Sequence, residues 1–418
     1  MIADLSPLFR IWSRITAELA IHQDGAPEEF TGQVVNPISG AVSSQDTACA
    51  AQVFATEYHR TGNEDWLLRA RAALRSLEEQ NAYSGLDEPR WDPIGWHFDE
   101  GSLYVTGTVL DAVWGARSLS DLLSGLGNDQ DHWISLMRYL ERCLHGPGRF
   151  AHNVVKPGTR PADVQNTTAI ALYLLEYAAA EGGFSDSPLM EERDRAYRHL
   201  MNGQRKDGFW PYVYPSRLQR IFFQFPYFKK VPLVRRYLYG SGSRSVLFGY
   251  SVHHCYVLYF LTKAALLRDT ELPFSQIAEG WDWVRGQLVS TRDGGVRFDF
   301  EWEPKPRRVR FCNFCDTNTY FLLIATLPLL GRMGVIDDLS YAEIAQGFLV
   351  HIENNLIEGE GSFPSIKPHE GQARVLRRIL PAIWESVAWK GALVSRFLLE
   401  ETFNRSTCLI DGTKVSTE

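Results

Sequence analysis

The sequence predicts an all-α fold, an (α/α)6 toroid in which six helical hairpins close into an inner and an outer ring of helices. Three observations favour this fold. Apolar, Ala-rich segments alternate with one-faced helical segments. The alternation has a period of about 60 residues, since Thr47, Thr106 and Thr167 are separated by 59 and 61 residues. Finally, turns in which a glycine is followed by an aromatic residue recur after the one-faced segments.

Six segments that are apolar nearly all round are expected to form the inner ring. They cover residues 44–62, 101–124, 163–182, 246–268, 314–334 and 381–402. Six one-faced segments rich in Glu, Arg and Trp are expected to form the outer ring. They cover residues 2–22, 64–80, 128–145, 188–204, 273–290 and 339–357. The sequence therefore predicts twelve main helices. Charged residues within the first of them interrupt the apolar run that a secretory signal peptide needs, so we expect an amphipathic helix there.

The turn glycines locate an insertion in this repeat. Gly148, Gly208, Gly295 and Gly361 are separated by 60, 87 and 66 residues, so the fourth unit carries about 27 extra residues. We place the insertion at residues 216–244, which contain seven Lys and Arg residues, seven Phe and Tyr residues and no acidic residue. We expect residues 1–418 to form a single toroidal domain. An open solenoid is the alternative, but the inner segments are too apolar to leave one face open, and neither terminus supplies a polar capping repeat.

Composition and charge restrict the class of protein. The formal net charge is −7, which argues against a nucleic-acid-binding protein. No apolar stretch is long enough to span a membrane, so we expect a cytoplasmic protein, or one peripheral at a membrane surface. The six cysteines include one Cys-x-x-Cys pair, Cys312 and Cys315, without a second pair at zinc-site spacing. We expect this pair to be small residues of an apolar helix, and we expect no metal and no cofactor.

The segment from Gln204 through Gly208 to Trp210 resembles the Gln-x-x-x-Gly-x-Trp repeat of terpenoid cyclases and prenyltransferase-like toroids. The segment Asp163-Val-Gln165-Asn166-Thr-Thr-Ala resembles the helix-start motif of squalene-hopene-type cyclases, whose central aspartate is the acid. Here Gln165 and Asn166 stand at the acidic positions. The same hairpins and similar turns also resemble toroidal glycan-active enzymes: polysaccharide lyases, unsaturated glucuronyl hydrolases, sugar 2-epimerases and uronyl epimerases. The resemblance implies the toroid.

In such a ring, the residues at the starts of the inner helices and in the glycine turns converge on one mouth, which is the default active site. The candidate catalytic residues are His254, Tyr250, His253 and Asp316. The candidate substrate-binding residues are Arg149, His152, Asn153, Asn166, Trp91, His97, Asn318 and Glu385. This mixture of imidazoles, amides, carboxylates and aromatics exceeds what a purely structural ring requires.

Tyr250 and His254 are four residues apart and share one helix face, as an acid–base pair requires. One of the adjacent histidines His253 and His254 is expected to face the mouth and the other the core. Asn153 or Asn166 would neutralise a substrate carboxylate by hydrogen bonding. Asp316 at a helix start is either an N-cap or a catalytic acid.

Three functions remain open. The first is an enzyme that acts on an anionic, uronate-containing glycan, by proton abstraction (lyase or epimerase) or by hydrolysis. Residues 216–244 favour it, because Arg binds carboxylates and aromatic rings stack on sugars. The second is a terpenoid cyclase or prenyl-binding toroid that takes an isoprenoid substrate and contacts the membrane surface through residues 216–244. The third is a non-catalytic binding scaffold.

Overall fold

The protein was analysed as a computed structural model. It describes residues 4–23, 32–34, 44–82, 102–123, 130–155, 158, 161, 163–181, 187–212, 250–268, 273–298, 314–316, 318–356, 366–368 and 387–402.

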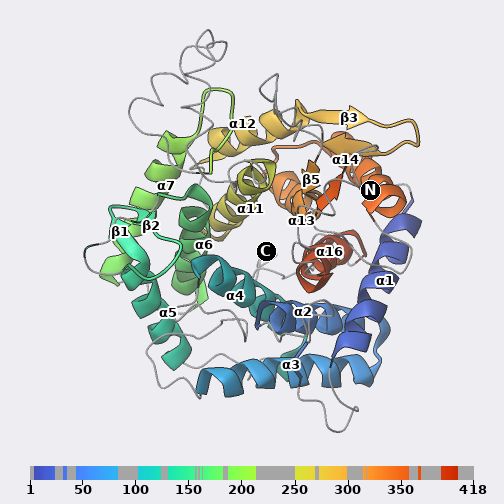
Figure 1. Cartoon of the computed structure of the whole chain (residues 1–418), viewed down its shortest axis with the longest axis horizontal. Coiled ribbons are helices and arrows are strands. Elements are labelled where there is room, and N and C mark those ends of the chain that lie inside the picture. The colour runs from blue at the N-terminus through green and yellow to red at the C-terminus, as the bar shows by residue number, and fades with distance from the viewer. Residues whose placement is uncertain are drawn as a thin grey trace, which may run out of the picture.

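The inner ring is closed, as the sequence predicts. Its members are α2 (Ser44–Thr61), α4 (Leu103–Arg117), α6 (Gln165–Glu181), α11 (Tyr250–Arg268), α13 (Asn318–Arg332) and α16 (Val387–Thr402). Each of these helices contacts the next, and α16 contacts α2, as the ring in Figure 1 shows. This closure excludes the open solenoid.

The outer ring covers the inner one (Figure 1). Its members are α1 (Ser6–His22), α3 (Glu64–Ala82), α5 (Gln130–Cys143), α7 (Glu191–Gly203), α12 (Phe274–Arg285) and α14 (Asp338–His351). The described segments thus contain the twelve predicted α-helices, together with the short helical turns η1 (Asp121–Leu123), η2 (Pro188–Met190) and η4 (Ile352–Leu356). The inner and outer assignments are confirmed.

Burial follows the two layers. In α13, every residue from Thr319 to Leu330 is buried, and in α6 every residue from Gln165 to Ala178 is buried. In outer helix α7 only the face with Ala196, Tyr197 and Leu200 enters the core, besides Glu192 and Gly203. A helix that packs against neighbours on both sides must be apolar nearly all round, which explains why this pattern was readable in the sequence.

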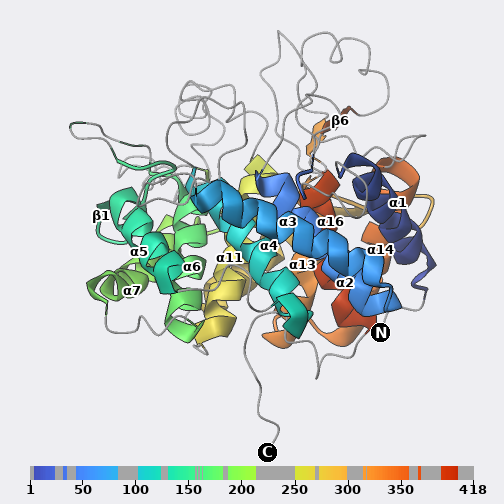
Figure 2. The same cartoon turned by 90° about the horizontal axis from the view of Figure 1, so that it is seen from below.

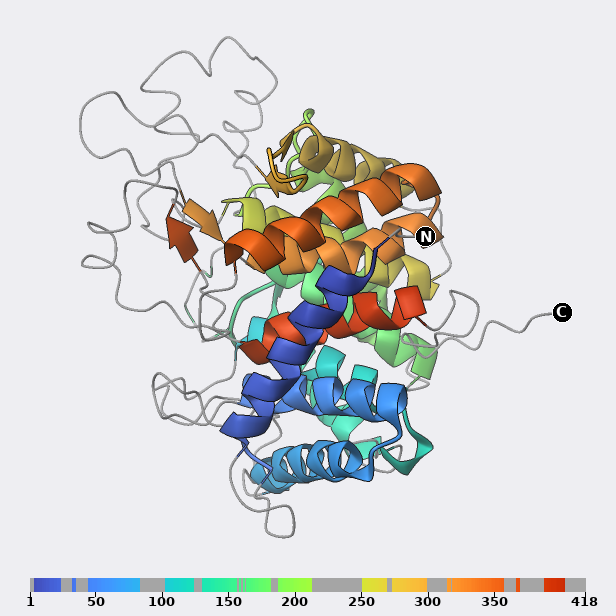
Figure 3. The same ribbon diagram turned by 90° about the vertical axis from the view of Figure 1, so that its right-hand side faces the viewer.

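Short strands lie in the connections between helices, partly at residues that the sequence analysis assigned to the ends of helical segments. They form three antiparallel pairs: β1 (Leu144–Gly146) with β2 (Arg149–Phe150), β3 (Leu288–Ser290) with β4 (Val296–Phe298), and β5 (Phe314–Asp316) with β6 (Ile366–Pro368). The first two pairs each lie between an outer helix and the next inner helix, whereas the third joins two connections, because β5 precedes α13 and β6 precedes α16. The pair β5 and β6 lies beyond one end of the ring in Figures 2 and 3. We call this end, where the inner helices begin, the mouth.

The turn from Gln204 to Trp210 is a packing device. The Gln204 side chain donates to the carbonyl of Gly208 at 2.9 Å and to that of Gln276 in α12 at 2.8 Å. The buried Trp210 indole donates to the Leu200 carbonyl at 3.0 Å. The motif therefore joins the end of α7 to the next outer helix, which is a structural reason for its occurrence in a toroid.

Some expectations are corrected or fall outside the described residues. Cys315 lies in strand β5, opposite Lys367, and not in an apolar helix, because α13 begins only at Asn318. Asp316 is the last residue of that strand rather than a helix N-cap. The insertion at 216–244 lies outside the described residues. None of the helices in the described segments combines the length and hydropathy that a membrane crossing requires.

Candidate functional site

Asn166 and His253 meet at the mouth. Asn166 is the second residue of α6 and is 4% exposed, and His253 is the fourth residue of α11 and is half-buried. The Asn166 amide nitrogen lies 3.4 Å from His253 Nδ1, so that the amide donates to this ring nitrogen. Asn166 Oδ1 has no hydrogen-bond partner within the protein. The pair therefore leaves one buried acceptor unsatisfied.

Tyr212 and His152 surround this pair. The Tyr212 ring centroid lies 4.0 Å from that of His253. The backbone carbonyl of Tyr212 accepts from the backbone amide of Gln165 at the start of α6. The His152 carbonyl accepts from the Leu103 amide at 2.7 Å, which holds the loop after β2 against the start of α4. The His152 side chain is exposed.

Two tyrosines extend the cluster from α4 to α11. The hydroxyl groups of Tyr104 and Tyr256 share a hydrogen bond of 2.5 Å, and their rings meet edge to face. We define the mouth cluster as Tyr104, His152, Asn166, Tyr212, His253 and Tyr256. Its members come from α4, α6, α11 and the two connections between them.

Both histidines of the mouth cluster are held neutral. Burial, and to a smaller extent the nearby His152, lowers the pKa of His253 to about 3. Burial also lowers the pKa of His152, although its side chain is exposed, as expected where surrounding protein limits hydration. At neutral pH the mouth cluster therefore presents neutral imidazoles.

His254, by contrast, belongs to the core. It is fully buried, its Nδ1 accepts from the Trp210 amide at 3.1 Å, and its Nε2–H donates to the Gly280 carbonyl at 3.1 Å. Its ring packs against Phe209 and Trp283. Both ring nitrogens are occupied by backbone groups, so this geometry disagrees with the predicted role of His254 as general base. Of the two adjacent histidines, His253 is the one at the mouth.

The other predicted residues are distributed differently. Arg149 in β2 lies 3.7 Å from Asp163, whose carboxylate also contacts His199 of outer helix α7 at 3.0 Å, so Arg149 is drawn toward the outer ring. Asn153 is half-buried, with Oδ1 unsatisfied, and Asn318 is the first residue of α13. Trp91, His97 and Glu385 lie outside the described residues, as do the side chains of Tyr250 and Asp316.

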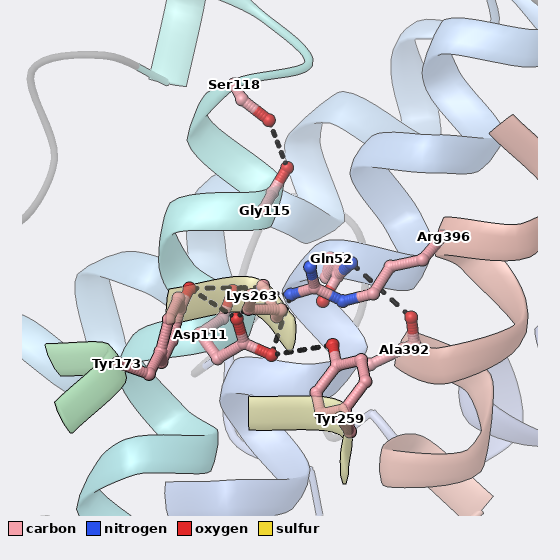
Figure 4. Close-up of polar contacts among 9 residues, drawn as sticks. All are labelled: Gln52, Asp111, Gly115, Ser118, Tyr173, Tyr259, Lys263, Ala392 and Arg396. Atoms are coloured by element: carbon pink, nitrogen blue, oxygen red, sulfur yellow. Dashed lines mark hydrogen bonds and ion pairs between the residues drawn. The ribbon is translucent and has the colours of Figure 1, made fainter. Parts of the chain in front are cut away.

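A second polar group, which the sequence analysis missed, lies inside the ring (Figure 4). Asp111 of α4 accepts from Lys263 of α11, from Arg396 of α16 at 2.8 Å, from Tyr173 at 2.6 Å and from Tyr259 at 3.2 Å. We call these five residues the central ion cluster. Burial alone would raise the pKa of Asp111, but Arg396 and Lys263 outweigh it and lower the pKa. The signal was present in the sequence as isolated charges within apolar segments.

The central ion cluster crosses the ring. In ring order, α4, α11 and α16 are alternate members, so the three charged residues do not come from neighbouring helices. Asp111 and Lys263 are each 1% exposed. Among the described residues, the partners of the Asp111 carboxylate are side chains of inner helices, which indicates a structural cluster that joins these helices.

Among the described residues, no three His, Cys, Asp or Glu side chains are grouped as metal ligands. Tyr104 and Tyr212 were not among the predicted site residues. Tyr212 follows the Gln204 to Trp210 turn by two residues, and only the closed ring brings it beside His253.

Comparison with protein-family models and with curated protein sequences gives no match. Comparison with solved structures gives toroids of glycan-active enzymes. An unsaturated glucuronyl hydrolase specific for heparin has a TM-score of 0.61 at 13% identity, covering 95% of this chain and 98% of that one. A sugar epimerase from a ruminal bacterium has a TM-score of 0.61 at 10% identity, covering 94% and 98%. A family 76 α-mannanase from Bacteroides thetaiotaomicron has a TM-score of 0.59 at 10% identity, covering 95% and 97%. At these identities the likeness establishes the fold.

Proposed function

We propose that this protein is a carbohydrate-active enzyme whose substrate binds at the mouth of the toroid. The observation that carries the proposal is the mouth cluster, which gathers neutral imidazoles, an unsatisfied amide oxygen and aromatic rings. Sugar sites combine aromatic surface with a few hydrogen-bonding groups. The toroids that this chain resembles act on glycans or sugars, according to their descriptions. The isoprenoid and membrane alternatives have no comparable support.

We further propose proton abstraction from a sugar carbon as the reaction, in the isomerase, epimerase or lyase class. His152 is the base in this proposal, because its side chain is exposed at the mouth and can reach a substrate. The surrounding protein lowers its pKa, which favours the neutral form that accepts a proton. His253 has its Nδ1 engaged by Asn166, so its Nε2 carries the proton and donates to a substrate oxygen. A neutral imidazole donor stabilises the negative charge that develops when the proton leaves.

The uronate part of the predicted substrate rests on composition. The basic segments that favour it include residues 216–244, which lie outside the described residues. Hydrolysis is the second candidate, because two of the similar structures are described as a hydrolase and a mannanase. It requires a pair of carboxylates. Asp46, in the first turn of α2, is a buried carboxylate in the described part of the chain, and it is the residue to test for this reaction.

The reaction class is tested by product analysis in heavy water. The purified protein is incubated with free aldoses, polyuronates and unsaturated uronyl disaccharides. In free aldoses and polyuronates, proton abstraction with return of a proton incorporates deuterium at a sugar carbon, elimination forms a conjugated carboxylate, and hydrolysis forms a new reducing end with neither change. In unsaturated uronyl disaccharides, hydrolysis is recognised by loss of the conjugated carboxylate, because the released unsaturated ring opens to a keto acid and takes up deuterium at carbon. Absence of conversion of every carbohydrate would refute the proposal.

The role of His152 is tested by substitution. We expect His152→Gln to lower turnover by about 10²-fold or more, as loss of a general base usually does. His59→Gln is the matched control, since His59 is an exposed histidine in the last turn of α2. Equal activity of the two variants would remove His152 from the mechanism.

A further inference from the structure

We infer that Asn166, His253 and Tyr212 form a subsite for the hydroxyl edge of an uncharged sugar ring, in which Asn166 Oδ1 accepts a hydrogen bond from a ring hydroxyl. The inference rests on the proposed function and adds the chemical class of the group that binds between α6 and α11. It separates this subsite from any position that would hold a carboxylate.

The first step is the contrast between two adjacent buried amides at the start of α6. Gln165 Oε1 and Asn166 Oδ1 both lack a hydrogen-bond partner within the protein. The Gln165 side chain, however, donates to the Pro211 carbonyl and packs against α7, where a Cβ atom at Gly203 would lie only 2.3 Å from its oxygen. Asn166 instead reaches α11, beside the half-buried His253. Of the two amides, Asn166 is the one placed for a ligand.

The second step is the pairing of donor and acceptor. Because His253 Nδ1 accepts from the Asn166 amide, His253 Nε2 carries the proton and is a donor. The subsite thus offers an acceptor, Asn166 Oδ1, and a donor, His253 Nε2–H. A sugar hydroxyl both donates and accepts, so one hydroxyl or two neighbouring ones match this pair. A carboxylate only accepts, and it would place its charge against the amide oxygen.

The third step is the aromatic surface. The half-buried Tyr212 ring is tilted by 31° from the His253 ring at a centroid distance of 4.0 Å. One face of a pyranose is lined by C–H groups, and aromatic rings bury such faces while polar atoms at the edge bind hydroxyls. An aromatic surface beside a donor and an acceptor is therefore complementary to the face and edge of an uncharged ring.

The test measures equilibrium binding to the full chain by calorimetry. The probes are methyl glucopyranoside, methyl mannopyranoside, their monodeoxy derivatives and the corresponding methyl glucuronoside. We expect one monodeoxy derivative to bind the wild type about tenfold more weakly than its parent, the loss of one hydrogen bond. In Asn166→Leu, which keeps the volume and removes the acceptor, parent and deoxy derivative should bind equally.

Asn202→Leu is the matched control, because Asn202 is an exposed asparagine on α7. If Asn166→Leu does not fold by circular dichroism, Asn166→Ala takes its place. A deoxy effect that persists unchanged in the Asn166 variant would overturn the subsite while leaving the proposed function intact. The same holds for a variant that weakens only the glucuronoside. A wild type that neither binds nor converts any carbohydrate would instead refute the proposed function.

Discussion

Replacing His254 with alanine should lower the free energy of unfolding strongly, because His254 stabilises the core and takes no part in the reaction. His254 links three parts of the ring, since it belongs to α11, accepts from the backbone of Trp210 and donates to the backbone of Gly280 in α12. All of these groups are buried around it, and two aromatic rings, Phe209 and Trp283, pack on the imidazole.

The expected magnitude follows from those contacts. Alanine leaves one backbone amide and one backbone carbonyl without a partner, at about 1–3 kcal/mol for each buried group. It also removes a ring from a packed aromatic environment, for which truncations to alanine typically destabilise by about 3–5 kcal/mol. Because these contributions overlap and the surrounding backbone relaxes in part, we expect a total loss at the lower end of their sum, about 5 kcal/mol in the free energy of unfolding.

Urea denaturation followed by circular dichroism measures this loss, with His253→Ala as the control. His253 is half-buried and has a single hydrogen bond of 3.4 Å among those resolved, so its removal should lower the free energy of unfolding by about 1 kcal/mol. The reasoning is refuted if His254→Ala keeps its unfolding midpoint and loses turnover, because the imidazole would then be catalytic.

Three further outcomes are expected. Asp111→Asn should lower the free energy of unfolding by about 3–5 kcal/mol, because it leaves the buried cations Lys263 and Arg396 without their carboxylate. An unchanged urea midpoint would contradict the structural role of the central ion cluster. The pKa of His254 is about 3 in the fold against an ordinary 6.5, so the unfolded chain binds an extra proton between these values. The contribution of this residue to the free energy of unfolding should therefore be fully present above pH 6.5 and should be lost as the pH falls toward 3, by up to about 5 kcal/mol. If the urea midpoint of His254→Gln declines with pH as much as that of the wild type, His254 is not the group responsible. Gly208→Ala should lower the melting temperature far more than Gly62→Ala. Both glycines have positive φ, but a Cβ atom at Gly208 would lie 2.0 Å from the Glu279 carbonyl oxygen, whereas a Cβ atom at Gly62 would meet open space. Equal melting temperatures of the two variants would exclude this steric explanation.

Much of the fold was readable from local patterns. The segment predicted at 163–182 is the helix Gln165–Glu181, and the segment predicted at 246–268 is the helix Tyr250–Arg268. These predictions succeeded because a helix buried on all sides must be apolar along its whole length, and a hairpin repeat must restore this pattern at a regular spacing. The short strands were missed because two or three residues beside a turn carry too little periodicity to be recognised.

The candidate site was predicted only in part. The sequence analysis identified Asn166, His152 and the two adjacent histidines, since polar residues at the starts of apolar helices are conspicuous. It could not determine which histidine faces the mouth, because neighbouring residues of a helix differ by about 100° in direction and the packing of the next hairpin decides the rest. That packing supplied Trp210 and Gly280 as partners for His254, which left His253 beside Asn166 and Tyr212.

By itself, the sequence determined the helices, their period and their division between an inner and an outer ring, because these follow from local spacing and hydrophobicity. Only the tertiary structure decided which side chains meet. Asp111, Lys263 and Arg396 are separated by 152 and 133 residues along the chain, yet they share one buried carboxylate across the ring. A charge in an apolar helix indicates that a buried partner is required. The identity of that partner depends on which side chains the closed ring brings together across its centre, and no local pattern encodes this.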